Sequence, residues 1–438
     1  MTSPSPAAPA GALPVAERIP TLDILRGFAL MGILIMNMPG FSSSFFAEAD
    51  GSHLWTGAVD RAAEQLREAL FSGKFNSMFS LLFGIGFTIQ YARLQARDAA
   101  SATPRYVRRL LALLAFGVIH ACVFWPGDVL HVYAILGFVL VWGLRRVGDR
   151  TIVALIVALL IYPALSGALR LVVITPAVTA EQVRIAQALE ASNMLAYGQG
   201  GWFDMVRENV RVMRYFYGGP LELWNALGWY LMLAMTMLLG VLAGRRRWVQ
   251  RADKLMPRIR RLTLWALVIG LGCGAAFTAI FELNRVPGPS LIKLVGHVCY
   301  GLSRLALMVF YVLVIVRLAQ HPRARRWLEP WRAAGRLPLT NYLMQSVICL
   351  ALFQHWGLGL WMKVGPAAGL LLALVIFFGV QVPWSLWWLK RHERGPMEAL
   401  WGRLTYGRPA RPAGTAPAID PCRELEISRT APRRSSGR

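Results

Sequence analysis

The sequence predicts an all-α polytopic membrane protein with about ten transmembrane helices and both termini in the cytoplasm. Its 438 residues are 56% hydrophobic, include 16 Trp and are only 16% charged, a composition typical of a helical membrane protein. Apolar segments close to the roughly 20 residues that cross a bilayer recur along the chain. Basic residues gather in alternate connections between these segments, as they do in cytoplasmic loops. These three observations define the fold class.

Ten apolar segments are the predicted spans. They lie at approximately 24–46, 75–95, 108–126, 129–145, 151–174, 223–244, 262–282, 291–317, 337–358 and 365–389. The fourth is short, and the eighth contains His297 and Arg304.

The charges of the connections predict the topology. Those after the second, fourth, sixth and eighth spans are rich in arginine, for example Arg245 to Arg247. Those after the first, fifth and seventh are mixed or acidic. The first group therefore belongs in the cytoplasm, and an even number of spans places both termini there.

Net charge and cysteines exclude other classes. The net charge of +24 arises from short basic loops beside apolar spans, which topology and anionic lipid head groups explain without a nucleic-acid partner. The bilayer is the predicted partner. Cys122, Cys273, Cys299 and Cys349 lie within apolar spans and Cys422 near the end of the chain, so no disulfide or metal site is predicted.

Five regions are expected along the chain. Residues 1–17 and 408–438 are predicted to be disordered, the latter as a basic tail. Residues 18–174 and 223–407 form the two membrane halves. Between them, residues 175–222 are predicted to form amphipathic helices on the outer surface, either roofing a cavity or simply packing there.

Arg26 is the first candidate functional residue. It follows Asp23 by three positions and precedes an uncharged apolar run, so it lies within the first span. Burying a charge at such depth costs roughly 2.5 kcal/mol or more, and such charges usually face a cavity or a partner. The alternative is a purely structural ion pair with Asp23.

Several motifs resemble a known family. The motifs of the N-terminal half are Leu22 to Asn37, Gly73 to Phe87, and His120 with Trp125 to Ala134; those of the C-terminal half are Gly335 to Ser346, Gly357 to Leu360 and Gly395 to Gly407. The first set resembles the YeiB-like bacterial membrane proteins, and the second resembles their domain of unknown function 418. The resemblance covers about residues 18 to 408 and implies the bacterial cytoplasmic (inner) membrane.

This family is in turn distantly similar to transmembrane acyltransferases, which pass an acyl group from cytoplasmic acyl-CoA to an acceptor outside. The heparan glucosaminide N-acetyltransferase branch has a similar Asp-x-x-Arg-Gly motif and a loop pattern that resembles His53, Trp55, Gly57 and Asp60. In that branch the loop histidine is catalytic, which implies this role for His53. The resemblance further implies acyl-CoA as a cosubstrate without a tightly bound cofactor, and a small molecule or envelope glycan as acceptor.

The predicted topology divides the polar residues of the spans into two layers. Near the cytoplasmic face lie Arg26, Gln90, Arg108 and Arg109. Arginine forks suit phosphate oxygens, so these four are candidate contacts for acyl-CoA. The alternative for Arg108 and Arg109 is a role as topology anchors.

The outer layer contains Asn37, Lys74, His120, Asp128 and Tyr133. A histidine suits a general base or nucleophile, so His120 is the leading catalytic candidate, with Asp128 as its orienter. They are two helical turns apart and are expected to bracket a pocket without necessarily touching. The alternatives are that His120 bonds a neighbouring helix, Asp128 caps the fourth span and Lys74 snorkels to head groups.

The ninth span carries a polar stripe, Asn341, Tyr342, Gln345 and Ser346. Such a stripe makes hydrogen bonds between helices or lines a substrate path. Asn37, Lys74, Tyr133, Asn341 and Gln345 are therefore candidate substrate contacts. Gly84 and Gly86 are expected to allow close helix packing.

Three functions remain open at this stage. The first is acyl transfer, with Arg26 holding phosphate and His120 or His53 moving the proton. The second is a transporter or channel for a small anionic solute, and the third is a scaffold without chemistry. The sequence lacks matched broken half-helices, which common transporter designs use, and this favours acyl transfer. The residues do not predict an oligomeric state.

Overall fold

The computed structural model describes residues 19–407. The two segments predicted to be disordered lie outside these residues. Within residues 19–407 the chain forms helices and no strand, which confirms the all-α class.

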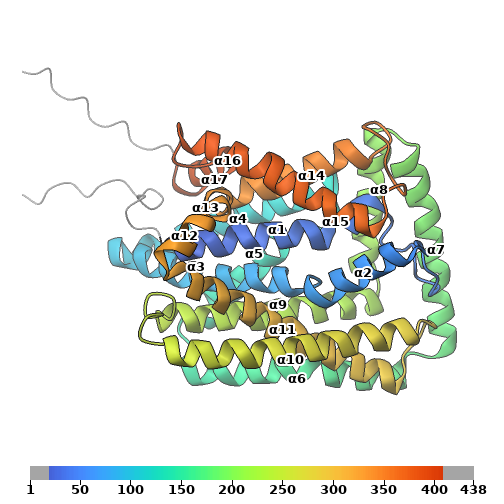
Figure 1. The fold of residues 1–438 in the computed structure, drawn as a ribbon, viewed down its shortest axis with the longest axis horizontal. Helices are drawn as coiled ribbons and strands as arrows, with labels where there is room; N and C mark the ends of the chain where they lie inside the picture. The colour runs from blue at the N-terminus through green and yellow to red at the C-terminus, as the bar shows by residue number, and fades with distance from the viewer. Residues whose placement is uncertain (1–18, 408–438) are drawn as a thin grey trace, which may run out of the picture.

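The chain folds into a bundle of long helices that lie side by side (Figure 1). The helices are α1 (Pro20–Ser42), α2 (Ala58–Leu70), α3 (Lys74–Arg97), α4 (Ala99–Ile119), α5 (Leu130–Val139), α6 (Asp149–Val173), α7 (Pro176–Gly198), α8 (Trp202–Gly218), α9 (Pro220–Arg245), α10 (Met256–Leu283), α11 (Leu291–Ala319), α12 (Pro322–Trp327), α13 (Glu329–Gly335), α14 (Pro338–Phe353), α15 (Pro366–Val375), α16 (Val382–Leu389) and α17 (Pro396–Tyr406). Three π-helical turns extend or join them: η2 (His120–Phe124), η3 (Leu140–Leu144) and η4 (Ile376–Gln381).

Each predicted span coincides with a helical segment of the bundle. Seven of these are long and apolar enough to cross a membrane, namely α1, α4 with η2, α6, α9, α10, α11, and α15 through α16. Two others, Leu130–Leu144 and Pro338–Phe353, are apolar but shorter. The multi-pass architecture is therefore confirmed, whereas the number of ten spans stays a prediction. The ninth predicted span ends early, because helix α14 stops at Phe353.

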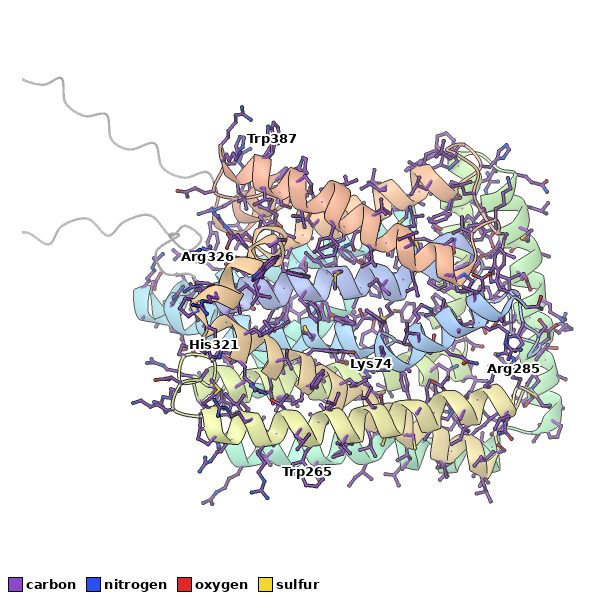
Figure 2. The ribbon with its side chains drawn as sticks, viewed as in Figure 1. Lys74, Trp265, Arg285, His321, Arg326 and Trp387 are labelled. Carbon is purple, nitrogen blue, oxygen red and sulfur yellow. The ribbon has the colours of Figure 1, made fainter. Side chains whose placement is uncertain are left out.

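The bundle has two ends that Figure 2 distinguishes. Arg326 and His321 lie at one end, and Arg285 lies at the other, beside α7. We call these the Arg326 end and the Arg285 end. The topology predicted from loop charge places the Arg326 end in the cytoplasm.

The insertion at 175–222 forms helices α7 and α8. Helix α7 runs across the Arg285 end of the bundle (Figure 1), and α8 packs against η2 and α9. Buried Glu208 joins the two helices, since it accepts hydrogen bonds from Ser192 Oγ at 2.5 Å and Asn193 Nδ2 at 3.0 Å. The insertion therefore covers the part of the bundle that contains His120.

Small residues let α3 and α9 approach closely, as predicted at Gly84. A Cβ atom there would lie 2.1 Å from the Met237 carbonyl oxygen, whereas one at Gly86 would meet nothing within 4 Å. The close-packing prediction is wrong for Gly86, which faces a cavity described below.

This difference predicts opposite outcomes for one substitution at two positions. Gly84→Ala should destabilise the protein by about 1–3 kcal/mol, because the backbone of α9 must move. Gly86→Ala should be neutral or slightly stabilising, since alanine favours a helix over glycine by up to about 1 kcal/mol. Thermal unfolding in one detergent measures both, and equal midpoints for the two variants would contradict the packing described here.

Candidate functional site

The local sequence around His120 brings two helices unusually close. Helix α4 ends in the π-helical turn η2, where the Trp125 amide donates to the His120 carbonyl at 2.8 Å. Such turns often occur at functional sites. A Cβ atom on Gly117 would lie 2.3 Å from the His131 nitrogen, so glycine is what allows α4 to meet the start of α5.

His120 and Asp128 are in direct contact. His120 Nδ1 lies 2.9 Å from Asp128 Oδ1, and the two side chains are 1% and 0% exposed. The sequence left open whether the two residues touch. They do, because the π-helical turn and the Pro126–Gly127 bend fold Asp128 back onto α4. On the other side of the ring, His120 Nε2 lies 2.8 Å from Ser346 Oγ on α14.

Asp128 also binds a second histidine that the sequence analysis did not select. Its Oδ2 atom accepts from the His131 amide at 3.0 Å and lies 2.8 Å from His131 Nδ1. Asp128 thus also caps the start of α5, as the alternative reading stated. His131 Nε2 in turn lies 2.8 Å from the Tyr217 hydroxyl on α8. The Asp-x-x-His spacing at a helix start was the available signal.

Ser346, His120 and Asp128 are joined by hydrogen bonds in the order of a Ser–His–Asp triad. We call His120, Asp128, His131, Tyr342 and Ser346 the His120 cluster. An ionised Asp128 only accepts hydrogen bonds, so His120 donates to it from Nδ1, which in a neutral imidazole leaves Nε2 as the acceptor that faces the Ser346 hydroxyl. The Tyr342 hydroxyl also donates to Asp128, at 3.3 Å. His120 is therefore held in the tautomer that a general base requires.

An arginine-lined cavity of about 330 Å³ lies between the Arg326 end and this cluster. We call it the arginine cavity. The arginines that line it are Arg26, Arg93, Arg97, Arg109, Arg336 and Arg394. Only two carboxylates, Asp23 and Glu398, line it as well, so its lining carries an excess of positive charge.

Both carboxylates are already engaged by the protein. Asp23 Oδ1 accepts from Arg26 at 2.7 Å. Glu398 accepts from the Leu339 and Thr340 amides at 2.7 and 3.0 Å, at the start of α14. Burial raises the pKa of Glu398, and these hydrogen bonds oppose the increase. Among the described residues of the lining, six arginines face two carboxylates, so positive charge prevails.

The cavity becomes apolar with depth and ends beside the His120 cluster. Its walls include Ile33, Phe79, Leu82, Phe83, Phe87 and Leu130. Buried Tyr133 and Tyr342 also line it. The Tyr342 ring lies 5.2 Å from the His120 ring, centroid to centroid. Tyr342 therefore lines the cavity and also packs beside the His120 ring.

The structure places three of the four predicted phosphate contacts in this cavity. Arg26, Gln90 and Arg109 line it, and the Arg109 guanidinium stacks 3.4 Å from the Trp401 ring centroid. Arg108 is separate: it is exposed and donates to the Leu404 carbonyl at 3.0 Å. Arg26 also forms the ion pair with Asp23 that the alternative interpretation predicted, while its role as a phosphate contact stays a prediction.

Of the outer-layer candidates, Tyr133 lines the arginine cavity, and its hydroxyl donates to the Asn76 carbonyl at 2.8 Å. Half-buried Asn37 lines neither this cavity nor the second one described below. Lys74 is fully buried, donates to the Glu68 carbonyl at 2.9 Å and lies near the middle of the bundle (Figure 2). The expectation that Lys74 snorkels is therefore wrong, because α2 and α11 cover it.

Asn341 and Gln345 make hydrogen bonds between helices. Gln345 Nε2 donates to the Leu30 carbonyl at 3.1 Å and to Gln381 Oε1 at 3.0 Å. Gln381 Nε2 donates to the Asn341 carbonyl at 2.8 Å. Both residues are buried and neither lines the arginine cavity, so the stripe joins α14 to α1 and η4. Its fourth member, Ser346, is the one that reaches His120.

His53 lies in a different group of side chains. Its Nε2 atom is 3.2 Å from Glu282 Oε1, at the end of α10. Atoms of His53, Glu48 and Glu64 lie within 4.8 Å of one another, a spacing at which a metal ion fits. Both Glu48 oxygens already accept hydrogen bonds, from the Leu54 amide and from Arg285, which explains the group as an ion-pair network of the loop. No hydrogen bond described within residues 19–407 joins His53 to the His120 cluster.

Fold and site together define a class: a multi-pass helical membrane protein with a buried Ser–His–Asp group at the deep end of an arginine-lined cavity.

Residues 243–408 match the family described as "Protein of unknown function (DUF418)". The chain is 33% identical over 405 residues to "Uncharacterized protein YxaH" of Bacillus subtilis, covering 89% of this chain and 94% of that protein. It is 27% identical over 422 residues to "Uncharacterized protein YeiB" of Escherichia coli, covering 91% and 98%. The chain belongs to this YeiB-like DUF418 family. No solved structure matches it at a significant level.

Proposed function

We propose that this protein is a transmembrane acyltransferase that takes an acyl group from cytoplasmic acyl-CoA and passes it to an acceptor of the cell envelope. The observation that carries the proposal is the arginine cavity, whose deep end reaches Tyr342 of the His120 cluster. Its lining changes from charged to apolar along its depth. An acyl-CoA molecule has the same order, with phosphates at one end and the thioester at the end of an apolar arm.

Charge and location both suit this ligand. The arginines converge from α1, α3, α4, α13 and the segment around α17, and guanidinium groups bind phosphate oxygens in a bidentate manner. The cavity lies toward the Arg326 end, which the loop charges predict to be cytoplasmic, where acyl-CoA is available. A volume of about 330 Å³ accommodates the pantetheine arm and a short acyl group, while the nucleotide lies at the mouth.

The chemical step requires a base. We assign this role to His120, and Tyr342 and Ser346, which cover its ring in this structure, must move to admit the substrates. In the proposed reaction His120 Nε2 takes the proton of the acceptor hydroxyl or amine as the acceptor attacks the thioester carbonyl. The C–S bond then breaks, and the proton passes to the departing CoA thiolate. Asp128 stabilises the imidazolium that forms between these steps. Ser346 Oγ lies 2.8 Å from His120 Nε2, which supports a binding position for the acceptor oxygen at this point.

Transport of an anionic solute is the alternative function. A transporter needs a path between the two ends of the bundle. The arginine cavity and the second cavity, which lies toward the Arg285 end, share no lining residue. This separation favours acyl transfer.

Binding of acetyl-CoA tests the proposal. We expect acetyl-CoA to raise the thermal unfolding midpoint of the purified protein, since a ligand that binds only the folded state stabilises it. Arg26→Ala should reduce the increase, because Arg26 lines the cavity. Arg108→Ala is the matched control and should preserve it, because the Arg108 side chain points away. If acetyl-CoA did not stabilise the unmodified protein, the proposal would be contradicted and transport would be favoured.

A further inference from the structure

A second cavity, of about 410 Å³, lies toward the Arg285 end. It is bounded by the ends of α6 and α10, the starts of α7, α9 and α11, and the loop after α1. In Figure 1 this region lies where α6 meets α7. The proposed acyl-CoA site does not account for it.

The lining of the second cavity is positively charged. Arg170 and Lys293 line it together with His297, and none of the described residues that line it is acidic. Neither Arg170 nor Lys293 forms an ion pair with a carboxylate within the described residues. Two cations of one cavity therefore lack a protein counter-charge.

Neutral groups hold these cations in place. Arg170 donates to Asn225 Oδ1, and its guanidinium lies 5.1 Å from the Trp224 ring centroid. Lys293 donates to the Val286 carbonyl and, at 3.1 Å, to the Gly288 carbonyl. An ammonium group has three donors, so one N–H of Lys293 remains for a ligand. Neutral partners therefore position both side chains, and no described carboxylate neutralises their charge.

The helix dipole adds to the unbalanced charge. Lys293 lies in the first turn of α11, where the partial positive charge of the helix terminus disfavours a cation. A bound anion would remove this repulsion. Helix N-termini with basic side chains are common sites for phosphate and carboxylate groups.

The rest of the lining indicates what the anion is attached to. Phe45, Phe46, Leu221, Phe281 and Leu294 form apolar walls, while Gln182, Asn225 and Ser290 offer neutral hydrogen-bonding groups. A cavity with this lining at one end of a membrane bundle suits a molecule that is both anionic and apolar.

We infer that the second cavity binds a phosphate or carboxylate group, with Arg170 and Lys293 as its charged contacts. This group comes either from a membrane lipid or from a soluble anion, and the chemistry of recognition is shared. The inference is independent of acyl transfer, because it involves none of the residues of the arginine cavity.

Thermal shift in a neutral detergent tests the inference with three probes: dilauroyl phosphatidylglycerol, dilauroyl phosphatidylcholine as the zwitterionic control, and inorganic phosphate. We expect the anionic lipid to stabilise the protein more than the zwitterionic lipid does. Arg170→Gln with Lys293→Gln should weaken the affinity at least about tenfold, because charged hydrogen bonds are lost. Arg184→Gln is the matched control, since exposed Arg184 on α7 pairs with Glu181, and it should leave the affinity unchanged.

The source of the anion follows from the probes. Stabilisation by the lipid alone identifies a lipid head group, and equal stabilisation by inorganic phosphate identifies a soluble anion; both require loss in the double variant. Equal affinity in the double variant and the unmodified protein would overturn the inference, as would equal stabilisation by the two lipids. A cooperative unfolding transition of the double variant without lipid, with a midpoint close to that of the unmodified protein, shows that it is folded.

Discussion

His120→Ala is expected to abolish acyl transfer while preserving the binding of acyl-CoA. General base catalysis contributes about 10²–10⁴-fold to a rate, so turnover should fall by at least about a hundredfold. Binding should persist because His120 does not line the arginine cavity, whereas Tyr342 and the arginines do. Turnover is measured as release of free CoA thiol in the presence of an acceptor, and binding as the thermal shift caused by acetyl-CoA.

Two further variants separate the base from its neighbours. Ser346→Ala removes the hydroxyl bonded to His120 Nε2 and should retain most of the activity, because the proposed role of Ser346 is to occupy the acceptor position. His321→Ala removes a histidine that Figure 2 places at the Arg326 end and should retain full activity. A folded His120→Ala protein with normal turnover would remove His120 from the reaction. Loss of turnover in Ser346→Ala alone would make Ser346 the nucleophile instead.

Composition and spacing predicted the fold class because a bilayer imposes a simple requirement on length and polarity. The same reasoning found Arg26, Arg109, His120 and Asp128, since polar groups within apolar spans are few. It also assigned both Arg108 and Arg109 to the contacts for acyl-CoA, although adjacent residues on a helix point about 100° apart. Only the rotation of α4, which packing against α5 and α17 sets, decides which arginine faces the cavity.

Contacts between distant segments were beyond sequence reasoning for a different reason. Ser346 bonds His120 across 226 positions of the chain. Asn341 and Gln345 belong to the same polar stripe and bond other segments. Intramembrane charge was also an incomplete guide. Arg304 is buried on α11, and its Nε donates to Ser77 Oγ at 2.5 Å, so a neutral partner on α3 contributes to accommodating a cation that the sequence alone would have assigned to a cavity.

Asp128→Ala should cause the largest loss of stability of any single substitution in the His120 cluster. The carboxylate accepts from His120 Nδ1, from the His131 ring and amide, and from the Tyr342 hydroxyl. Its removal leaves at least three buried donors without an acceptor, and each costs about 1–3 kcal/mol. We therefore expect a loss of about 3 kcal/mol or more in the free energy of unfolding.

Asp128→Asn distinguishes the charge from the shape of this side chain. Asparagine keeps the volume. Its oxygen must face the His131 amide, which only donates, so its NH₂ group faces His120 Nδ1 and His120 must change its tautomer. Stability should fall less than in Asp128→Ala. Turnover should fall by a factor similar to that expected for His120→Ala, because His120 no longer offers a free Nε2. Thermal unfolding and CoA release measure the two effects. Asp204→Ala is the control. Asp204 on α8 is exposed, pairs with exposed Arg207 and accepts from the Gly201 amide, so its cost should stay below about 2 kcal/mol. If Asp128→Ala cost no more than Asp204→Ala, the carboxylate would not be the centre that joins α4, α5 and α14.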